Sequence, residues 1–135
     1  MTTEEKIALH LSHLPQEKSV ELTALFHLIR TQLKDSPLHF FDGLNEQGKV
    51  VANPTIGFGS CRLTYKDGSF QDTFRIGISA NSTGISIHIL GLPDKTYLTH
   101  TFGSRLGKAK ITGYCIRFSK LSHIDLDVLR EIVHV

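Results

Sequence analysis

Three arginines and a histidine stand at the polar positions of stretches in which apolar and polar residues alternate. They are Arg62, Arg75, His88 and Arg117. Side chains alternate between the two faces of a strand, so we expect these four on one face of a sheet, together with Thr64, Ser86 and Cys115. A guanidinium group can bind a carboxylate or a phosphate through two parallel hydrogen bonds, which favours an anion site. The alternative is the solvated polar face that antiparallel sheets commonly have.

A glycine-rich stretch at residues 103–110 adds Lys108 and Lys110 to the candidate ligand-binding residues. Backbone N–H groups in a turn can hold phosphate when lysine and arginine are close. The stretch lacks the GxxxxGK[ST] spacing and follows an expected helix, whose C-terminal end repels anions. A glycine-terminated helix with cations complementing that end is therefore the alternative.

The two cysteines, Cys61 and Cys115, are too few for a disulfide framework and too far apart for a CxxC site. Alternation places Cys61 in the core and Cys115 on the polar face beside Arg117, which makes Cys115 the better candidate for a reactive thiol. No spacing signature pairs it with a histidine, so no catalytic residue is assigned.

Metal-ligand spacing occurs at His10, His13 and Glu17, which fall at i, i+3 and i+7. Pro15 interrupts the helix that would align these side chains, and there is no HExxH motif. We therefore predict neither a metal site nor a cofactor.

Helical spacing of apolar residues predicts four helices: one that ends at Pro15, one over about residues 17–34, one from Asp94 to Gly103, and a last one that begins with a capping box formed by Ser122 and Asp125. Alternation predicts strands near residues 55–65, 74–79, 85–90 and 114–119. Residues 38–41 and 49–52 are interpreted as a short hairpin. The expected order is α-α-β-β-β-α-β-α.

The first of these strands is irregular. Ile56 and Phe58 share one parity, whereas Cys61, Leu63 and Tyr65 share the other. An extra residue near Gly59 would bring both groups to one face, so we predict a bulge there.

The fold class is thus α+β: an antiparallel sheet of four or slightly more strands with helices packed on one face. The 135 residues, 40% of them hydrophobic, fit one domain spanning residues 1–135. A net charge of +2 is too small to indicate nucleic-acid binding. With no signal-like N-terminus and no apolar stretch of ~20 residues, we expect a cytoplasmic monomer or homodimer without membrane partners.

Several short motifs occur in a characteristic order: residues 55–60 (TIGFGS), 65–68 (YKDG), 106–108 (LGK), 112–116 (TGYCI), then Lys120-Leu121 and Ile124-Asp125. This set resembles the YdhG-like domains of unknown function over about residues 50–133. The resemblance implies no catalytic residues, but some bacterial members are described as frataxin-like iron chaperones. The chain departs from the family at residues 79–83 (SANST), where many members have a Ser-Pro-Arg-Lys turn.

The leading prediction is a non-enzymatic protein that binds a small anionic ligand or an acidic partner on the polar sheet face. The first alternative, implied by the resemblance, is intracellular iron delivery. Carboxylates suited to iron are dispersed over Glu4, Glu5, Glu17, Glu21 and Asp35. The second alternative is an enzyme that uses Cys115 with a nearby histidine.

Overall fold

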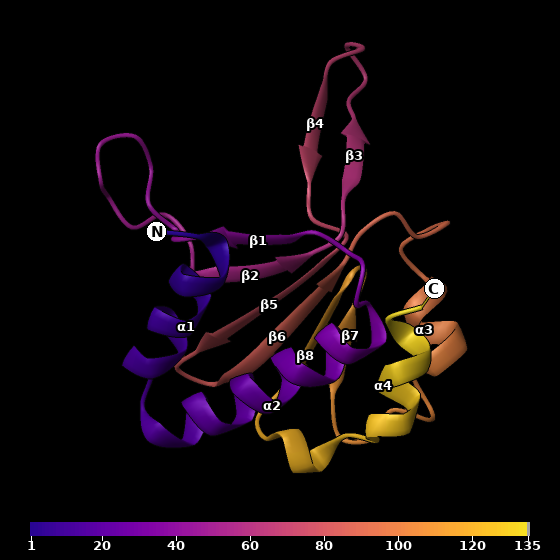
Figure 1. The fold of residues 1–135 in the computed structure, drawn as a ribbon. Coiled ribbons are helices and arrows are strands. Elements are labelled where there is room, and N and C mark those ends of the chain that lie inside the picture. The colour runs from indigo at the N-terminus through magenta and orange to yellow at the C-terminus, as the bar shows by residue number, and fades with distance from the viewer. Residues whose placement is uncertain (135) are drawn as a thin grey trace.

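A six-stranded antiparallel sheet forms the centre of the computed structural model, which describes residues 1–134 (Figure 1). Its strands, in the order in which they pair, are β1 (Leu38–Phe41), β2 (Thr55–Phe58), β5 (Ile76–Asn81), β6 (Gly84–Ile89), β8 (Cys115–Phe118) and β7 (Lys110–Thr112). The predicted α+β class is confirmed. The edge strands β1 and β7 make the sheet larger than four strands.

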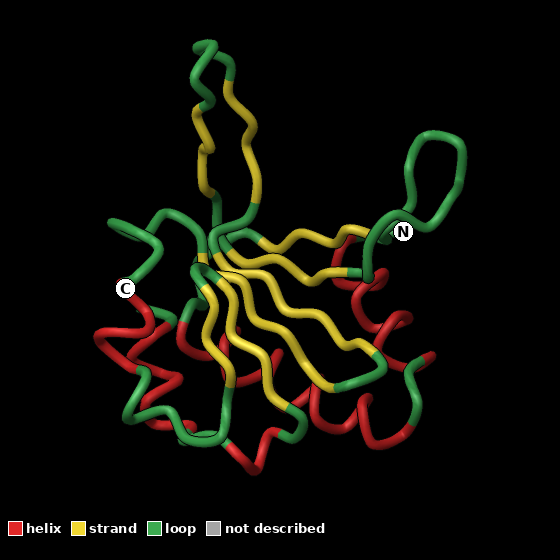
Figure 2. Tube along the Cα trace, turned by 180° about the vertical axis from the view of Figure 1, so that it is seen from behind, coloured by secondary structure: helices red, strands yellow, loops and turns green. Residues whose placement is uncertain are grey.

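The helices cover one face of this sheet. They are α1 (Thr3–His13), α2 (Gln16–Gln32), α3 (Tyr97–Phe102) and α4 (Leu126–Ile132), with a 3-10 turn at Leu121–His123. In Figure 1 α2 crosses in front of the strands, and the reverse view in Figure 2 shows the strands with no helix in front of them. We call this second surface the open face.

The core lies between the sheet and the helices. Alternate residues of the central strands point into it, among them Ile78, Ile87 and Phe118, which are 0%, 0% and 5% exposed. The helices contribute apolar side chains of the same kind, such as Leu25, which is fully buried. Arg117, next to Phe118, is exposed, because neighbours in a strand face opposite ways. The predicted separation of Phe118 and Ile87 from Arg117 and His88 is confirmed.

Local signals account for the helix ends. The chain leaves the helical conformation at Leu14, because the residue before a proline is pushed out of the α region. At α4 the side chain of Asp125 accepts hydrogen bonds from the N–H groups of Asp127 and Val128. Asp125 is therefore the N-cap.

The predicted bulge near Gly59 is wrong, since the chain turns out of the sheet there. Gly59 has a φ of 74°, and β3 (Cys61–Thr64) pairs only with β4 (Phe70–Thr73) in a separate hairpin that projects from the sheet (Figure 1). A left-handed glycine redirects the backbone, whereas a bulge only shifts its alternation. We call residues 61–73 the projecting hairpin.

The predicted pairing of residues 38–41 with residues 49–52 is also wrong. Leu38–Phe41 is a strand, but its partner is Thr55–Phe58, with Phe40 opposite Ile56. The intervening segment forms a long loop with one isolated bridge between Leu44 and Val50. Thr55–Phe58 is the better partner because its alternating Ile56 and Phe58 both point into the core, whereas Val50 and Val51 are exposed.

Candidate functional site

Arg62 does not lie on the sheet. It belongs to the projecting hairpin, where its Nε is 2.8 Å from Oδ1 of Asp72 and its guanidinium lies 3.9 Å from the ring centre of Phe70. The hydrogen bond to Asp72 raises the pKa of Arg62 and lowers the pKa of the carboxyl. The prediction that Arg62 shares a face with Arg117 is wrong, because alternation does not reveal which strands pair.

Arg75 lies at the end of the sheet where the projecting hairpin leaves it. Its N–H donates to the carbonyl of Phe58 at 3.0 Å. A β-carbon placed on Gly91 would lie 2.7 Å from Nη1 of Arg75, so the guanidinium lies beyond the end of β6. Arg117 is aligned with Ser86 and Ser79 in the sheet. Ser79 follows Arg75 by four residues, so Arg117 lies ~13 Å from Arg75 along the strand direction. Arg75 and Arg117 therefore do not converge.

Lys108 lies in a turn that has few backbone donors to offer an anion. The N–H groups of Arg105, Leu106, Lys108 and Ala109 all donate to main-chain carbonyls, with Lys108 bonded to His123 at 2.9 Å. Phosphate-binding turns need such groups to point at the ligand. The geometry thus favours the structural interpretation of this glycine-rich stretch.

The remaining candidates do come together, and they bring Cys115 with them. In the register of the sheet Lys110 is opposite Arg117, and Cys115 is opposite His88. Directly opposed residues on one face have Cβ atoms about 4.5–5.5 Å apart. We call His88, Lys110, Cys115 and Arg117 the open-face cluster.

Among the described residues no carboxylate forms an ion pair with this cluster. Within residues 1–134 the ion pairs are Arg30–Glu4, Arg62–Asp72, Arg105–Glu131 and Arg130–Asp127, none of which involves Lys110 or Arg117. The strand positions on the open face also carry no acidic residue. They are His39, Phe41, Thr55, Gly57, Gly77, Ser79, Asn81, Gly84, Ser86, His88, Lys110, Thr112, Cys115 and Arg117. Like charges directly opposite each other destabilise a sheet, so an anion would relieve repulsion here.

The thiol and the imidazole of the cluster influence each other. Hydrogen bonding to Cys115 raises the pKa of His88 against the effect of burial. At Cys115 burial acts to raise the pKa, but hydrogen bonds to His88 and Arg117 and their charges outweigh it, so the pKa of the thiol is lowered. Sequence reasoning missed this pair because its only signal is the pairing of β6 with β8, two strands separated by α3 and β7.

Next to the cluster the open face is hollowed. A hollow of about 340 Å³ is lined by Ser79, Ser86, His88 and Arg117, with the segments at residues 52–55 and 81–83 at its rim. The two serines are only 4% and 5% exposed. A smaller hollow of about 220 Å³ is lined by Lys110 and Arg117. Arg117 therefore stands between two polar depressions.

An aromatic surface adjoins the hollow on the side of β1 and β2. Phe74 lies over Gly57 and Gly77, where added β-carbons would come within 2.7 and 2.5 Å of its side chain. Its ring centre is 5.7 Å from that of Phe41. Because Gly77 is aligned with His88, this apolar surface begins one strand away from the cluster.

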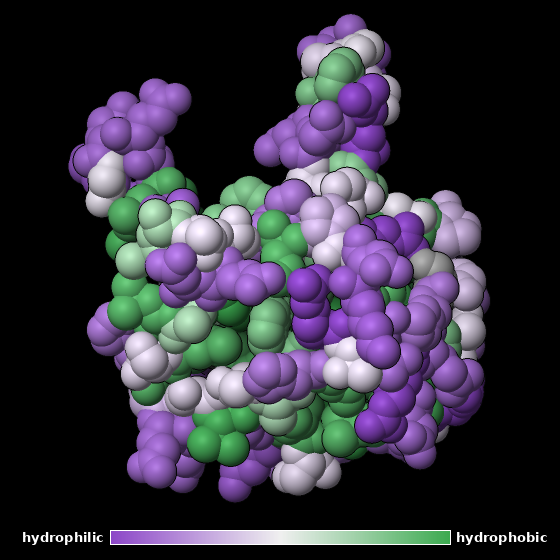
Figure 3. Space-filling view, viewed as in Figure 1, coloured by the Kyte–Doolittle hydropathy of each residue, from purple (hydrophilic) through white to green (hydrophobic). Residues whose placement is uncertain are grey.

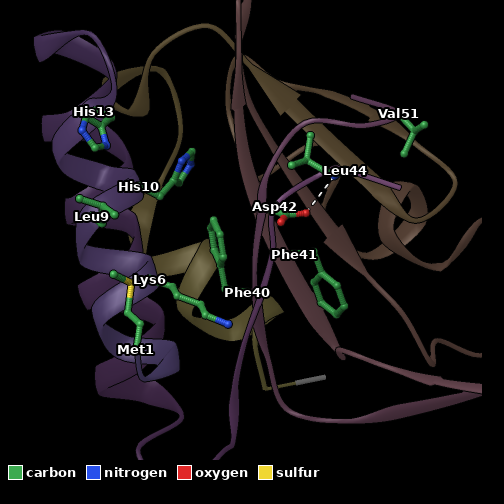
Figure 4. A pocket seen from close by; sticks show the side chains of 11 residues that line it. Met1, Lys6, Leu9, His10, His13, Phe40, Phe41, Asp42, Leu44 and Val51 are labelled. Atoms are coloured by element: carbon green, nitrogen blue, oxygen red, sulfur yellow. Dashed lines mark hydrogen bonds between the residues drawn. The ribbon is translucent and has the colours of Figure 1, made fainter. Parts of the chain in front are cut away.

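A different hollow, of about 610 Å³, lies between α1 and the segment at residues 40–51 (Figure 4). His10 points at Phe40, with ring centres 5.4 Å apart, and burial together with His13 lowers its pKa. Exposed apolar residues such as Leu9 and Leu44 gather beside it, on the side of α1 that is hydrophobic in Figure 3.

The structure offers little support for a metal centre. In the part of the chain that is described, no three His, Cys, Asp or Glu side chains are grouped so as to hold an ion. Glu21, one of the acids considered for iron, accepts a hydrogen bond from the N–H of Leu121 and so joins α2 to the 3-10 turn.

No family model matches the chain, and no curated protein or solved structure matches it either. Membership of the YdhG-like family therefore stays a prediction. Among residues 1–134 no helix has the length and apolar character needed to cross a membrane.

Proposed function

We propose that the protein binds a small anionic ligand on the open face of its sheet, at the open-face cluster. The observation that carries this proposal is the direct opposition of Lys110 and Arg117 on a face whose strands have no carboxylate. Two unpaired cations held side by side cost stability unless something offsets them.

A carboxylate or phosphate fits this arrangement chemically. Arg117 can bind it through two parallel hydrogen bonds, Lys110 adds a second charge, and the imidazole of His88 can donate a further hydrogen bond. Arg117 lines both hollows, so a ligand held by Lys110 and Arg117 in the hollow of about 220 Å³ can extend into the larger one, where the hydroxyl groups of Ser79 and Ser86 can donate further hydrogen bonds. The larger hollow, of about 340 Å³, lies at the small end of the range for ligand pockets.

Thermal unfolding in different anions tests the proposal. We expect phosphate or malonate to raise the melting temperature more than chloride does at equal ionic strength. At ten times its Kd a ligand adds ~1.4 kcal/mol, or ~5 °C for a chain of this size. Phosphate also stabilises proteins by exclusion from their surfaces, so the wild type alone does not decide the question.

The deciding comparison uses two double variants of equal charge. Lys110→Gln with Arg117→Gln removes the opposed cations, whereas Lys49→Gln with Lys66→Gln removes two exposed cations from the loop after β1 and from the projecting hairpin. We expect the extra rise to vanish in the first variant and to persist in the second. An equal rise in both would show that the open-face cluster is ordinary surface.

A further inference from the structure

We propose that Cys115 is a reactive thiol that undergoes exchange with anionic disulfides, which the cations of the open-face cluster recruit. This inference rests on the proposed function, because the same Lys110 and Arg117 would hold the anionic group. It adds a covalent step and names the class of substrate.

The surroundings of Cys115 carry the inference. His88 faces it from β6, Thr112 faces it from β7, Arg117 follows on the same face of β8, and Lys110 lies diagonally across on β7. A thiolate is the attacking form of cysteine, and neighbouring cations stabilise it. No acidic residue on these strands opposes that effect. The lowered pKa of Cys115 agrees with this placement.

Cys61 provides an internal comparison. It is also half-buried and free, but it lies on the projecting hairpin opposite Thr73. A β-carbon placed on Gly91 would lie 3.4 Å from Sγ of Cys61 and 2.7 Å from Nη1 of Arg75, so one guanidinium is close to this thiol. Cys61 shares neither the imidazole of His88 nor the opposed pair of Lys110 and Arg117, so it controls for the effect of these groups.

The step balances without further reagents. The thiol proton of Cys115 passes to the imidazole of His88, and the thiolate attacks one sulfur of the disulfide R–S–S–R. A new S–S bond forms between Cys115 and one R–S group, and the other leaves as R–S⁻ with the electron pair of the broken bond. Cys115 is oxidised to the disulfide level and half of the reagent is reduced to a thiolate.

The experiment compares three disulfides of different charge on two single-thiol proteins. Cys61→Ser leaves Cys115, and Cys115→Ser leaves Cys61. Each reacts with dianionic 5,5′-dithiobis(2-nitrobenzoate), neutral 2,2′-dithiodipyridine and dicationic cystamine, and second-order rates are measured by absorbance or mass spectrometry. Circular dichroism confirms that each variant is folded.

For each protein we divide the rate with the dianionic reagent by the rate with the neutral reagent. This ratio should be about tenfold higher for Cys115 than for Cys61, as for charge-steered encounters, and should fall to the Cys61 value when Lys110→Gln and Arg117→Gln are added. With dicationic cystamine the corresponding ratio should be lower for Cys115 than for Cys61 and should increase when the two cations are removed. With the neutral reagent, the rate of Cys115 should increase with pH as the thiol ionises. The midpoint of this increase should lie below pH ~8.5, the usual pKa of cysteine. His88→Gln should move this midpoint upward.

Two contrary results are distinguishable. If Cys115 has an ordinary midpoint and reacts no faster than Cys61 with the neutral reagent, the reactive thiol is refuted, and the anion site is judged by the melting experiment alone. If the midpoint is low but the reagents' charge makes no difference, recruitment by Lys110 and Arg117 is refuted, whereas the proposed function is still decided by the melting comparison of the two double variants.

Discussion

Replacing two neighbouring residues of β8 by alanine gives a direct test of the sheet's two faces. Phe118 points into the core opposite Ile85 and is 5% exposed, whereas Arg117 is opposite Ser86 on the open face. Phe118→Ala should be strongly destabilising, and Arg117→Ala should not.

The size of the effect follows from burial. A buried phenylalanine removes at least ~150 Å² from water, which at ~25 cal/mol per Å² corresponds to ~4 kcal/mol, and alanine retains part of this. The cavity that remains adds to the loss, so ~3–5 kcal/mol is expected in total. Arg117→Ala should change stability by no more than ~0.5 kcal/mol. Relief of its repulsion with Lys110 favours a small gain.

Urea unfolding followed by circular dichroism measures both changes. With a slope of ~1.5 kcal/mol/M, Phe118→Ala should lower the midpoint by ~2–3 M at an unchanged slope. A similar loss of stability in Arg117→Ala and Phe118→Ala would mean that the two side chains are equally buried, and the assignment of the faces would be abandoned.

Two further predictions concern stability. Asp125→Ala should lower the free energy of unfolding in urea by ~1 kcal/mol, because it leaves the N–H groups of Asp127 and Val128 without their cap. Asp127→Ala should lower it by less than half as much, and equal losses in the two variants would contradict this role of Asp125. Burial and His13 lower the pKa of His10, so the unfolded chain binds a proton at this imidazole more readily than the folded chain does. The contribution of neutral His10 to stability is therefore fully present above pH ~6.5 and declines as the pH falls below that value. His10→Leu should flatten this decline while His100→Gln at an exposed position leaves it unchanged, and an equal acid-side slope in His10→Leu and wild type would refute the assignment.

The sequence was sufficient for those features that depend on local periodicity. Alternation in residues 85–90 and 114–119 correctly placed Ile87 and Phe118 in the core and His88 and Arg117 outside it. This works because a buried face forces every second residue to be apolar, whichever strand lies alongside.

Features that depend on strand pairing were not predictable in this way. A glycine such as Gly59 suits both a bulge and a left-handed turn, and only the turn sends Arg62 into a separate hairpin. The opposition of His88 and Cys115 likewise requires the register between two strands that are distant in the chain. Alternation shows which face of the sheet a side chain occupies but not which strand lies beside it. The sequence therefore predicted that His88, Cys115 and Arg117 share a face, but not that Cys115 is opposite His88.

The way in which the projecting hairpin is attached makes the protein modular. The strands on either side of it, β2 and β5, pair directly, with Phe58 opposite Ile76, and the N–H of Arg75 bonds to the carbonyl of Phe58. The two ends of the excursion are thus fixed by the sheet, and the sheet's own hydrogen bonds do not pass through it. The closure cost of a loop grows slowly with its length, so evolution or engineering can lengthen, shorten or exchange this excursion without changing the register below it.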